Sequence, residues 1–472
     1  MAVPVIARHP RLALFALVWL SCTWFGSWAF NPNNATRLFA AMALVERHQA
    51  TIDDYARLTI DQARFDGHVY LDKAPGMTLL ALPAVAIADR LLPPRPPIPD
   101  TVYDAPFEAY LTVRLRLAVA MVSAVIAALA AVALYDLAWR TTSSASGALF
   151  ASIGFALGTP VWGWSTTLFG HAPVAGLFVI ATWALWRAGE ERPARFAALG
   201  GAALGLAALI ELQAVLAGAV IALWGVWRLR RGPRAIGAMV LAGGATLLIP
   251  LASYNLVAFG TPFRLGYQGV TGFPGMHEGL FGLTAPKPVV IAKILVGLRR
   301  GLVWVAPILL LAVPGLCLFP RRMRGLGVMA AATAIVVLLV NAAYVYWDGG
   351  HSTGPRHAVP AIGMLAIGLA PLWARLRQHW ARAAAVALLG VSVAINLAIA
   401  AANVTTPDTY RFPLWDPILT VDWPNGALRT LPSDFLGWSP VAGVALYLAL
   451  ALPLGILLLA NERRAHRVAP AT

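Results

Sequence analysis

The segment Arg228-Leu-Arg-Arg-Gly-Pro-Arg234 joins two apolar stretches, at about 213–229 and 235–257, and contains four arginines and no acidic residue. A transmembrane helix needs about 20 predominantly apolar residues, so each of these stretches can form a span. Arginine-rich loops of the same kind recur between apolar stretches along the whole chain. Because Lys and Arg are retained on the cytoplasmic side of a bilayer, we expect these loops to lie inside.

The charges of the two sets of loops differ. Of the 36 basic residues, 19 lie in the arginine-rich loops with only four acids, and the other 17 share the opposite side with 17 acids. Hydrophobic residues make up 59% of the chain and charged residues 12%. The net charge of +15 follows from this asymmetry, and no contiguous basic stripe indicates a nucleic-acid partner. The partner expected from composition is therefore the lipid bilayer.

The apolar pattern predicts an all-α polytopic membrane protein with about twelve transmembrane helices and both termini cytoplasmic. We treat residues 1–472 as a single integral membrane domain, interrupted by three long exterior loops at 31–111, 258–300 and 403–438. In the first loop, Met77–Leu92 is apolar but short, so we expect an interfacial helix rather than a span. The expected spans are 11–30, 112–138, 145–162, 172–187, 196–211, 213–229, 235–257, 301–319, 325–345, 357–374, 383–402 and 439–460.

The first exterior loop contains the densest group of chemically active side chains. It begins with Asn33-Asn34-Ala-Thr-Arg37, and a helical pattern follows with Asn34 as its expected cap. Five carboxylates then occur within 20 residues, which exceeds what a solvated loop requires. The candidate catalytic bases are Asp53, Asp54 and Asp61, and His68 and Tyr70 are candidates for an acceptor or sugar pocket.

Lysine usage singles out one residue of this loop. The chain has 33 arginines and three lysines, Lys73, Lys287 and Lys293, all on the expected exterior side. A lysine retained against such a bias favours a role as a compact point charge, for example on a phosphate. Chance retention is the alternative for so few residues.

Further candidates lie at the exterior ends of later spans. Glu211 and Gln213 set the boundary between spans 196–211 and 213–229, and a carboxylate there should face the exterior or a polar cavity. The glycine-rich loop 346–357 lets the backbone approach a ligand closely. The candidates for phosphate binding are Lys73, Arg37, Arg299, Arg300, Arg356 and His351, and those for the acceptor or sugar pocket also include His171, Glu211, Tyr267 and Trp347.

The sequence specifies no metal site. Cys22 and Cys317 lie in apolar spans, and no His/Cys/Asp spacing fits zinc. It specifies no cofactor either, although a divalent cation held by carboxylates and a phosphate stays an alternative.

These motifs, in this order, resemble the GT-C superfamily of membrane glycosyltransferases, and more closely the bacterial branch related to protein O-mannosyltransferases and to the lipid A aminoarabinose transferase. The resemblance depends on Arg37, on Lys73-Ala-Pro-Gly76 and on Gly349-Gly-His-Ser-Thr-Gly-Pro-Arg356. It implies a multi-pass protein of the bacterial cytoplasmic (inner) membrane, with juxtamembrane helices in a long first periplasmic loop and a periplasmic active site.

The resemblance also implies an activity. Such enzymes move a sugar from a polyprenyl-phosphate donor to a lipid, glycan or protein acceptor with inversion, and a loop aspartate is the base. The lysine that matches Lys73 contacts the donor phosphate, and we expect Arg356 and Arg299 or Arg300 to assist it.

One position departs from the family's pattern. Relatives with an Asp-Glu-x-Arg motif carry the catalytic aspartate three residues before the arginine that matches Arg37, and this chain has Asn34 there. An amide cannot accept the proton. We therefore expect Asp53 first, and Asp61 second, to be the base.

Three other functions stay open from the sequence. One is a transporter or flippase of a lipid-linked substrate, which would require ionisable groups at mid-membrane. Another is a non-catalytic glycolipid-binding membrane protein, which Asn34 favours. The third is a polymerase or ligase of envelope glycans that uses a diphosphate donor.

Overall fold

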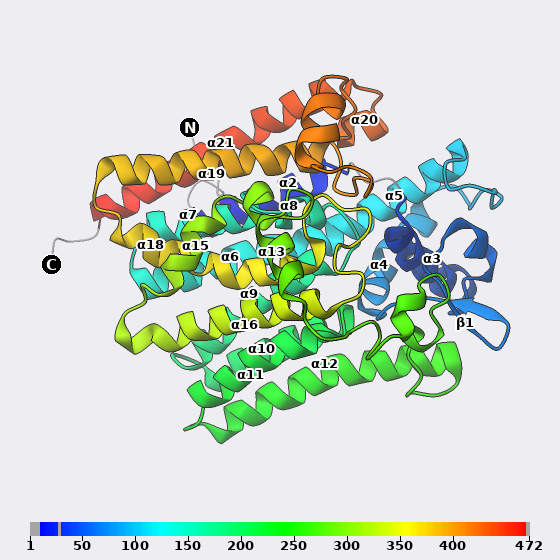
Figure 1. Cartoon of the computed structure of the whole chain (residues 1–472), viewed down its shortest axis with the longest axis horizontal. Helices are drawn as coiled ribbons and strands as arrows, with labels where there is room; N and C mark the ends of the chain where they lie inside the picture. The colour runs from blue at the N-terminus through cyan, green and yellow to red at the C-terminus, as the bar shows by residue number, and fades with distance from the viewer. Residues whose placement is uncertain (1–9, 27–29, 469–472) are drawn as a thin grey trace.

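The computed structural model describes residues 10–26 and 30–468, with side chains described as far as residue 460. It is an all-α polytopic membrane protein whose long helices run roughly along one axis, with α3, α4 and β1 gathered at one end (Figure 1). The principal helices are α2 (Pro10–Trp24), α3 (Pro32–Arg47), α4 (Gly76–Leu91), α5 (Ala105–Met121), α6 (Ser123–Thr142), α7 (Ala145–Ala156), α8 (Val161–Ser165), α9 (His171–Ala188), α10 (Pro193–Ile210), α11 (Ala214–Arg228), α12 (Pro233–Phe259), α13 (Pro288–Val296), α14 (Leu302–Val305), α15 (Leu309–Leu316), α16 (Arg324–Ala343), α17 (Val359–Ala366), α18 (Leu369–Arg375), α19 (His379–Ala401), α20 (Leu431–Phe435) and α21 (Pro440–Val468).

The predicted spans coincide with helices, but several are shorter or broken. Within the described residues, six helices are long and apolar enough to cross a membrane, or up to seven if a bent pair counts as one span. That pair comprises 356–366 and α18, which meet at 41°. The predicted span 301–319 is divided into α14 and α15, and the predicted span 145–162 ends early because α7 stops at Ala156. The membrane-protein fold class is confirmed, and the count of twelve stays a prediction.

The end of the molecule opposite α3 and α4 contains a cluster of arginines around one carboxylate. The buried Asp136 on α6 pairs with Arg11 of α2 at 2.5 Å, with Arg140 at 2.8 Å and with Arg187 of α9 at 3.2 Å. Trp183 donates a further hydrogen bond to it at 2.8 Å. A buried carboxylate is stable only when it is paired and hydrogen-bonded, so this cluster ties three helices together at their arginine-bearing ends.

The first long loop folds into two packed helices with an ordered connection. α3 begins at Pro32, and its cap is Asn31, whose side chain accepts a hydrogen bond from Asn33 N at 3.0 Å. The prediction of Asn34 as the cap was wrong because Pro32 occupies the first helical turn, which places Asn34 inside the helix. The helix expected at Met77–Leu92 is α4, and it packs along α3. This arrangement places α3 and α4 over the ends of the bundle helices.

A small β-hairpin, absent from the all-α prediction, connects these two helices. β1 (Ala63–Phe65) and β2 (His68–Tyr70) pair antiparallel around Asp66-Gly67, whose φ values are +51° and +85°. Two positive φ angles are the requirement of a tight two-residue hairpin turn. The Asp-Gly pair is thus the sequence signal that indicates this hairpin.

Candidate active site

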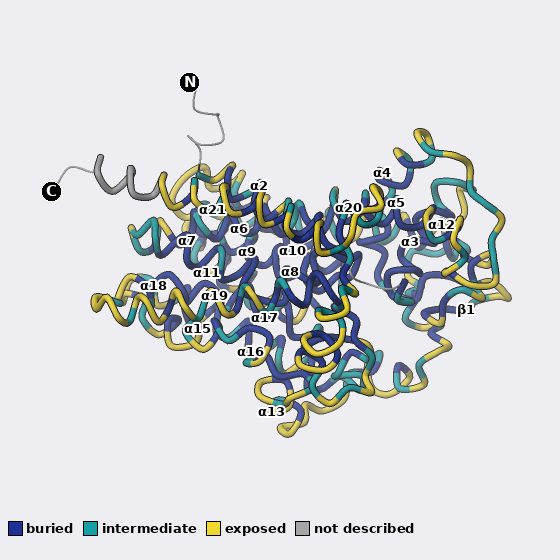
Figure 2. The backbone as a smooth tube through the Cα atoms, turned by 90° about the horizontal axis from the view of Figure 1, so that it is seen from above, coloured by how far each residue is buried: buried dark blue, intermediate teal, exposed yellow. Residues whose placement is uncertain are grey.

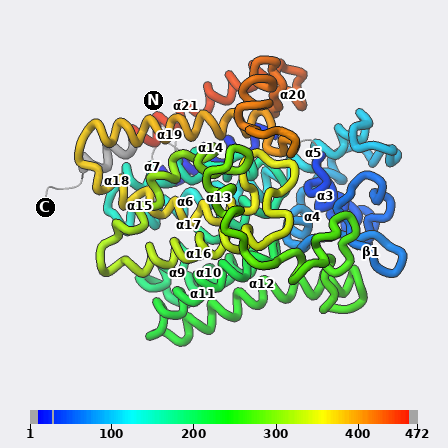
Figure 3. Tube along the Cα trace, viewed as in Figure 1, coloured from blue at the N-terminus to red at the C-terminus, as the bar shows by residue number. Residues whose placement is uncertain are grey.

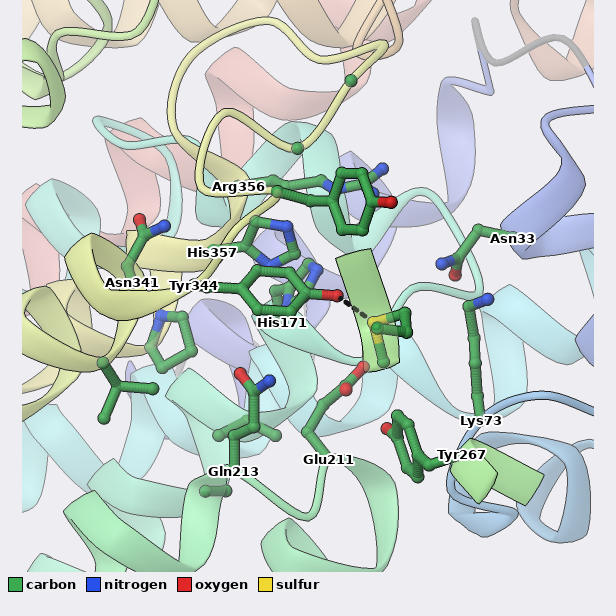
Figure 4. A pocket seen from close by; sticks show the side chains of 18 of the residues that line it. Asn33, Lys73, His171, Glu211, Gln213, Tyr267, Asn341, Tyr344, Arg356 and His357 are labelled. Carbon is green, nitrogen blue, oxygen red and sulfur yellow. Dashed lines mark hydrogen bonds between the residues drawn. The ribbon is translucent and has the colours of Figure 1, made fainter. Parts of the chain in front are cut away.

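A cavity of about 320 Å³ lies where the first loop meets the ends of the bundle helices. Its walls come from three segments far apart in the chain: 33–73, 171–217 and 337–360, together with 267–276 and Asp408. Figure 3 shows these segments, from blue through green to yellow, converging at this end of the bundle, and Figure 4 shows the side chains that enter the cavity. The predicted site residues among its lining are Arg37, Asp61, Lys73, His171, Glu211, Tyr267 and Arg356.

Lys73 lies between two carboxylates on one side of the cavity. Its Nζ donates to Asp61 Oδ2 at 2.5 Å and to Asp72 Oδ2 at 2.8 Å. All three side chains are largely buried, with exposed fractions of 13%, 8% and 5% respectively. Burial raises the pKa of Asp72, and Lys73 opposes this only in part because Asp61 shares the same ammonium group. The lysine is therefore fully neutralised, and the trio carries an excess of negative charge.

A second ion pair crosses the cavity from the first loop to the bundle. Arg37 Nη2 on α3 lies 2.7 Å from Glu211 Oε1, and its Nη1 donates to Asn33 Oδ1. Glu211 lies in the break between α10 and α11, where its extended backbone (φ −141°, ψ 109°) ends α10 at Ile210. The boundary predicted from Glu211 and Gln213 is confirmed. Gly170 lies against this carboxylate so closely that a Cβ would collide with it.

Arg356 differs from the other two cations of the cavity. It lies on the short 3-10 turn Arg356–Ala358 before α17, and its guanidinium packs over the Phe169 ring at 5.0 Å. The guanidinium forms no hydrogen bond or ion pair with any described residue, and its Nε is buried without a partner. Gly349, with φ +75°, lies directly over its stem, where a Cβ would come within 2.9 Å of Cγ and Nε. The glycine-rich loop is thus shaped around a half-buried guanidinium that has no ion-pair partner among the described residues, which makes an anion-binding position.

The part of the cavity away from these charges is apolar. Its walls come from the first turns of α9 and α11, the last turns of α16 and the start of α17. The residues are Val174, Phe178, Ala214, Ala217, Val337, Val340 and Pro360. The cavity therefore combines a charged region and a hydrocarbon-like region, which is the shape of an amphiphilic ligand.

Sequence reasoning missed several residues of the cavity wall. Tyr344 and Tyr346 stack edge-on at 6.0 Å, and Phe273 packs on Tyr346 at 5.5 Å. His357 packs against both Tyr344 at 5.3 Å and His171 at 4.8 Å. Figure 4 shows Tyr344, His357 and His171 grouped beneath Arg356. The sequence feature that could have indicated this group is the glycine-rich loop itself, because Tyr344 lies just before the loop and His357 is its last residue.

The structure places four predicted residues of the first loop outside the cavity. Asp53 accepts hydrogen bonds from Val69 N at 2.6 Å and pairs with His68 Nδ1 at 2.7 Å, so both side chains serve the hairpin at the surface. Asp54 pairs with Arg47 at 2.5 Å. Tyr70 is buried against Phe259, with ring centroids 5.0 Å apart.

The structure also places four predicted residues near the glycine-rich loop outside the cavity lining. Arg300 is 1% exposed and donates to the carbonyl oxygens of Asp348 and Ser352, both at 2.6 Å, and of Gly350. It therefore holds the loop and has no free nitrogen for a phosphate. Arg299 pairs with the rim residues Asp348 at 2.9 Å and Asp408 at 3.6 Å, and His351 is exposed 3.9 Å from Asp408. Trp347 packs beside Lys293, whose Nζ lies 5.5 Å from the ring centroid.

Within the part of the chain that the structure describes, no three His, Cys, Asp or Glu residues come together as a metal site. The divalent cation held jointly by carboxylates and a phosphate stays an untested alternative.

Comparison with known proteins gives a fold. No protein-family model and no curated protein sequence matches the chain. Among solved structures, ArnT from Cupriavidus metallidurans bound to undecaprenyl phosphate is similar at 16% sequence identity and a TM-score of 0.51, covering 96% of this chain and 76% of that one. ArnT from the same organism in the apo state is 16% identical, with a TM-score of 0.49 and coverage of 96% and 77%.

The chain has the ArnT fold. ArnT is a GT-C lipid A aminoarabinose transferase, so the resemblance to GT-C enzymes drawn from the loop motifs is confirmed as a likeness of fold. At 16% identity the similarity to ArnT concerns the fold and does not assign roles to individual residues of this chain.

Proposed function

We propose that this protein is a glycosyltransferase that moves a sugar from a polyprenyl-phosphate donor to a hydroxyl acceptor at the outer face of the cytoplasmic membrane. The observation that carries the proposal is Arg356, a cavity cation without a counter-ion beside an apolar compartment. The printed description of one structural neighbour, ArnT bound to undecaprenyl phosphate, supports the same class of ligand.

The donor phosphate is assigned to Arg356. Its half-buried guanidinium has no ion-pair partner among the described residues, and a phosphate oxygen pair is its best geometric match. Arg37 and Lys73 are less suited to bind the phosphate before reaction, since Glu211 already neutralises Arg37 and two aspartates neutralise Lys73. This changes the order expected from the sequence, in which Lys73 came first.

The polyprenyl chain is assigned to the apolar compartment. Ala214 and Ala217 leave room on one wall, and Val337 and Val340 face them from α16. Burial of each CH₂ contributes about 0.8 kcal/mol, so a few isoprene units in this compartment supply most of the donor's binding energy. A soluble sugar phosphate would leave the compartment unfilled.

Asp61 is assigned as the base, in place of Asp53 and Asp54. It lines the cavity and reaches Lys73, whereas Asp53 is bound to the hairpin backbone and Asp54 to Arg47. In the proposed step, Asp61 takes the proton of the acceptor hydroxyl, the acceptor oxygen bonds to the anomeric carbon, and the bond from that carbon to the phosphate oxygen breaks. The configuration inverts, and polyprenyl phosphate leaves.

The arrangement around Lys73 couples proton transfer to departure of the phosphate. Before reaction, Asp61 and Asp72 outnumber Lys73, so the trio carries one net negative charge. When Asp61 takes the proton, Lys73 stays paired with Asp72 and the trio becomes neutral as negative charge grows on the leaving phosphate. The trio therefore repels the phosphate less in the transition state than in the bound donor, which is the condition for catalysis.

The test is turnover of a radiolabelled polyprenyl-phosphate sugar by purified protein in proteoliposomes. Asp61→Asn should lower kcat by about 10²–10⁴-fold while leaving donor binding in place, because the amide cannot accept the proton. Asp53→Asn is the matched variant from the same loop and should retain activity. An Asp61→Asn protein with wild-type turnover would refute the assignment of the base. Donor movement across the membrane without sugar transfer would instead favour the flippase.

A further inference from the structure

Helix α13 lies at the cavity end of the bundle, on its periphery. The residues before it pair with the last turn of α16: Thr284 N donates to Ala343 O at 2.8 Å, and Lys287 N donates to Ala342 O at 3.1 Å. α16 starts at Arg324, in an arginine-only loop, so α13 lies at the opposite level of the membrane. Figure 2 shows α13 at the edge of the molecule beside exposed segments.

The outward face of α13 is apolar apart from Lys293, and no described residue covers it. Val289 is 61% exposed, Val296 60% and Leu295 38%, whereas Val290 and Ile294 on the other face are buried. Leu298, just beyond the helix, is 41% exposed. A short helix with one apolar face toward the surroundings, at the level where spans end, lies in the interface between headgroups and acyl chains.

The same helix carries two of the chain's three lysines. Lys287 precedes its first residue and Lys293 lies in its last turn, and both are exposed. Neither forms an ion pair with any described residue. The sequence between Glu278 and Asp348 contains no acidic residue at all, so α13 has no acidic neighbour in its own stretch of chain. The charge left uncompensated is therefore available to an external anion.

We infer that α13 is a binding site for the headgroups of anionic phospholipids in the leaflet next to the cavity. The apolar face enters the acyl boundary, and Lys287 and Lys293 meet lipid phosphates at the membrane surface. Arginine alone anchors the other membrane face, whereas all three lysines lie on this side, beside its arginines. The inference does not depend on the proposed transferase activity.

The site is connected to the mouth of the cavity. Lys293 packs over Trp347, whose carbonyl oxygen accepts from Asn341 Nδ2 at 2.8 Å, and Asp348 follows on the cavity rim. A lipid bound at Lys293 would hold Trp347 and thereby the start of the glycine-rich loop.

The experiment measures lipid binding directly, by native mass spectrometry of the detergent-purified chain titrated with phosphatidylglycerol or phosphatidylethanolamine. The wild-type protein should prefer phosphatidylglycerol. Since each lysine near an anionic surface contributes about fivefold, the double variant Lys287→Gln/Lys293→Gln should bind phosphatidylglycerol about 25-fold more weakly. The double variant Lys287→Arg/Lys293→Arg keeps the charge and should retain most of the binding.

Two controls complete the design. Arg64→Gln removes an exposed charge from the hairpin, far from α13, and should leave lipid binding unchanged. The unfolding temperature without added lipid should be nearly the same for all variants, because both lysine side chains are exposed and the single ring contact of Lys293, with Trp347, lies at the surface. Lys293→Gln alone serves if the double variant does not fold. Equal binding of the two lipids by wild type, undiminished binding by the Gln variant, or full competition by glycerol phosphate would overturn the inference.

Discussion

Arg300, which holds the glycine-rich loop, and Arg356, which belongs to it, should respond to the same substitution in opposite directions. Arg300→Met removes the donor for three loop carbonyls, and each hydrogen bond to a charged group contributes about 1.5–3 kcal/mol. Because solvent can reach part of the opened loop, we expect a loss of about 3–5 kcal/mol in the free energy of unfolding. The loop should lose its shape and the cavity its rim.

Arg356→Met should stabilise the ligand-free protein. Its guanidinium has no hydrogen-bond or ion-pair partner among the described residues, so its replacement removes a desolvation cost and no contact of this kind. We expect a gain of about 1 kcal/mol in the free energy of unfolding. The same substitution should weaken binding of polyprenyl phosphate about 100-fold, which corresponds to about 3 kcal/mol of charge-assisted hydrogen bonding.

The assays are denaturant unfolding in detergent micelles, without ligand, and calorimetric titration with a short-chain polyprenyl phosphate. The two variants control for each other, since each removes one positive charge at or beside the glycine-rich loop. The reasoning is refuted if Arg356→Met destabilises the protein as much as Arg300→Met does, or if it binds the phosphate as tightly as wild type.

Three further predictions concern the cavity. Burial raises the pKa of Asp72 above its ordinary 3.8 in the folded protein, so the folded protein keeps a proton that the unfolded chain has lost. The free energy of unfolding should therefore fall as pH rises from about 4 through the raised pKa. Unfolding measured across this pH range should show a flatter dependence for Asp72→Asn. Ala217→Trp should fill the apolar compartment and abolish donor binding in the calorimetric titration, whereas Leu223→Trp, 69% exposed on the same helix, should not. Glu211→Gln should cost about 2 kcal/mol in the free energy of unfolding, because it leaves the 1% exposed Arg37 without its counter-ion; an unchanged unfolding midpoint would contradict this.

The fold class could be predicted because the local composition of the sequence is enough to identify membrane spans. Apolar length and the distribution of arginine depend on neighbours in sequence, not on packing. The break at Glu211 follows the same rule, since a carboxylate between two apolar stretches must face a polar cavity. The breaks within 301–319 and 357–374 could not be placed in this way, because an apolar stretch remains apolar whether its helix is straight or bent.

The roles of the loop carboxylates were beyond local reasoning. Asp53, Asp54 and Asp61 occur in one short exterior stretch, and composition ranks them equally. The hairpin separates their positions, since Asp53 accepts a hydrogen bond from Val69 N, while Asp61 contacts Lys73 at the cavity. The neighbours Arg299 and Arg300 show the same limit, because one points to the cavity rim and the other to loop carbonyls.

The sequence by itself determined that this chain crosses a membrane many times and that the acidic residues lie mainly at one end of its helices. It also identified Arg37, Lys73 and Arg356 as candidates for one site. Only the tertiary structure decided which of these charges are already neutralised. Charge compensation depends on contacts between residues as distant in the chain as Arg37 and Glu211, and such contacts exist only once the helices have packed. For that reason Arg356, the cavity cation without an ion-pair partner in the part of the chain that the structure describes, could be recognised only in the folded protein.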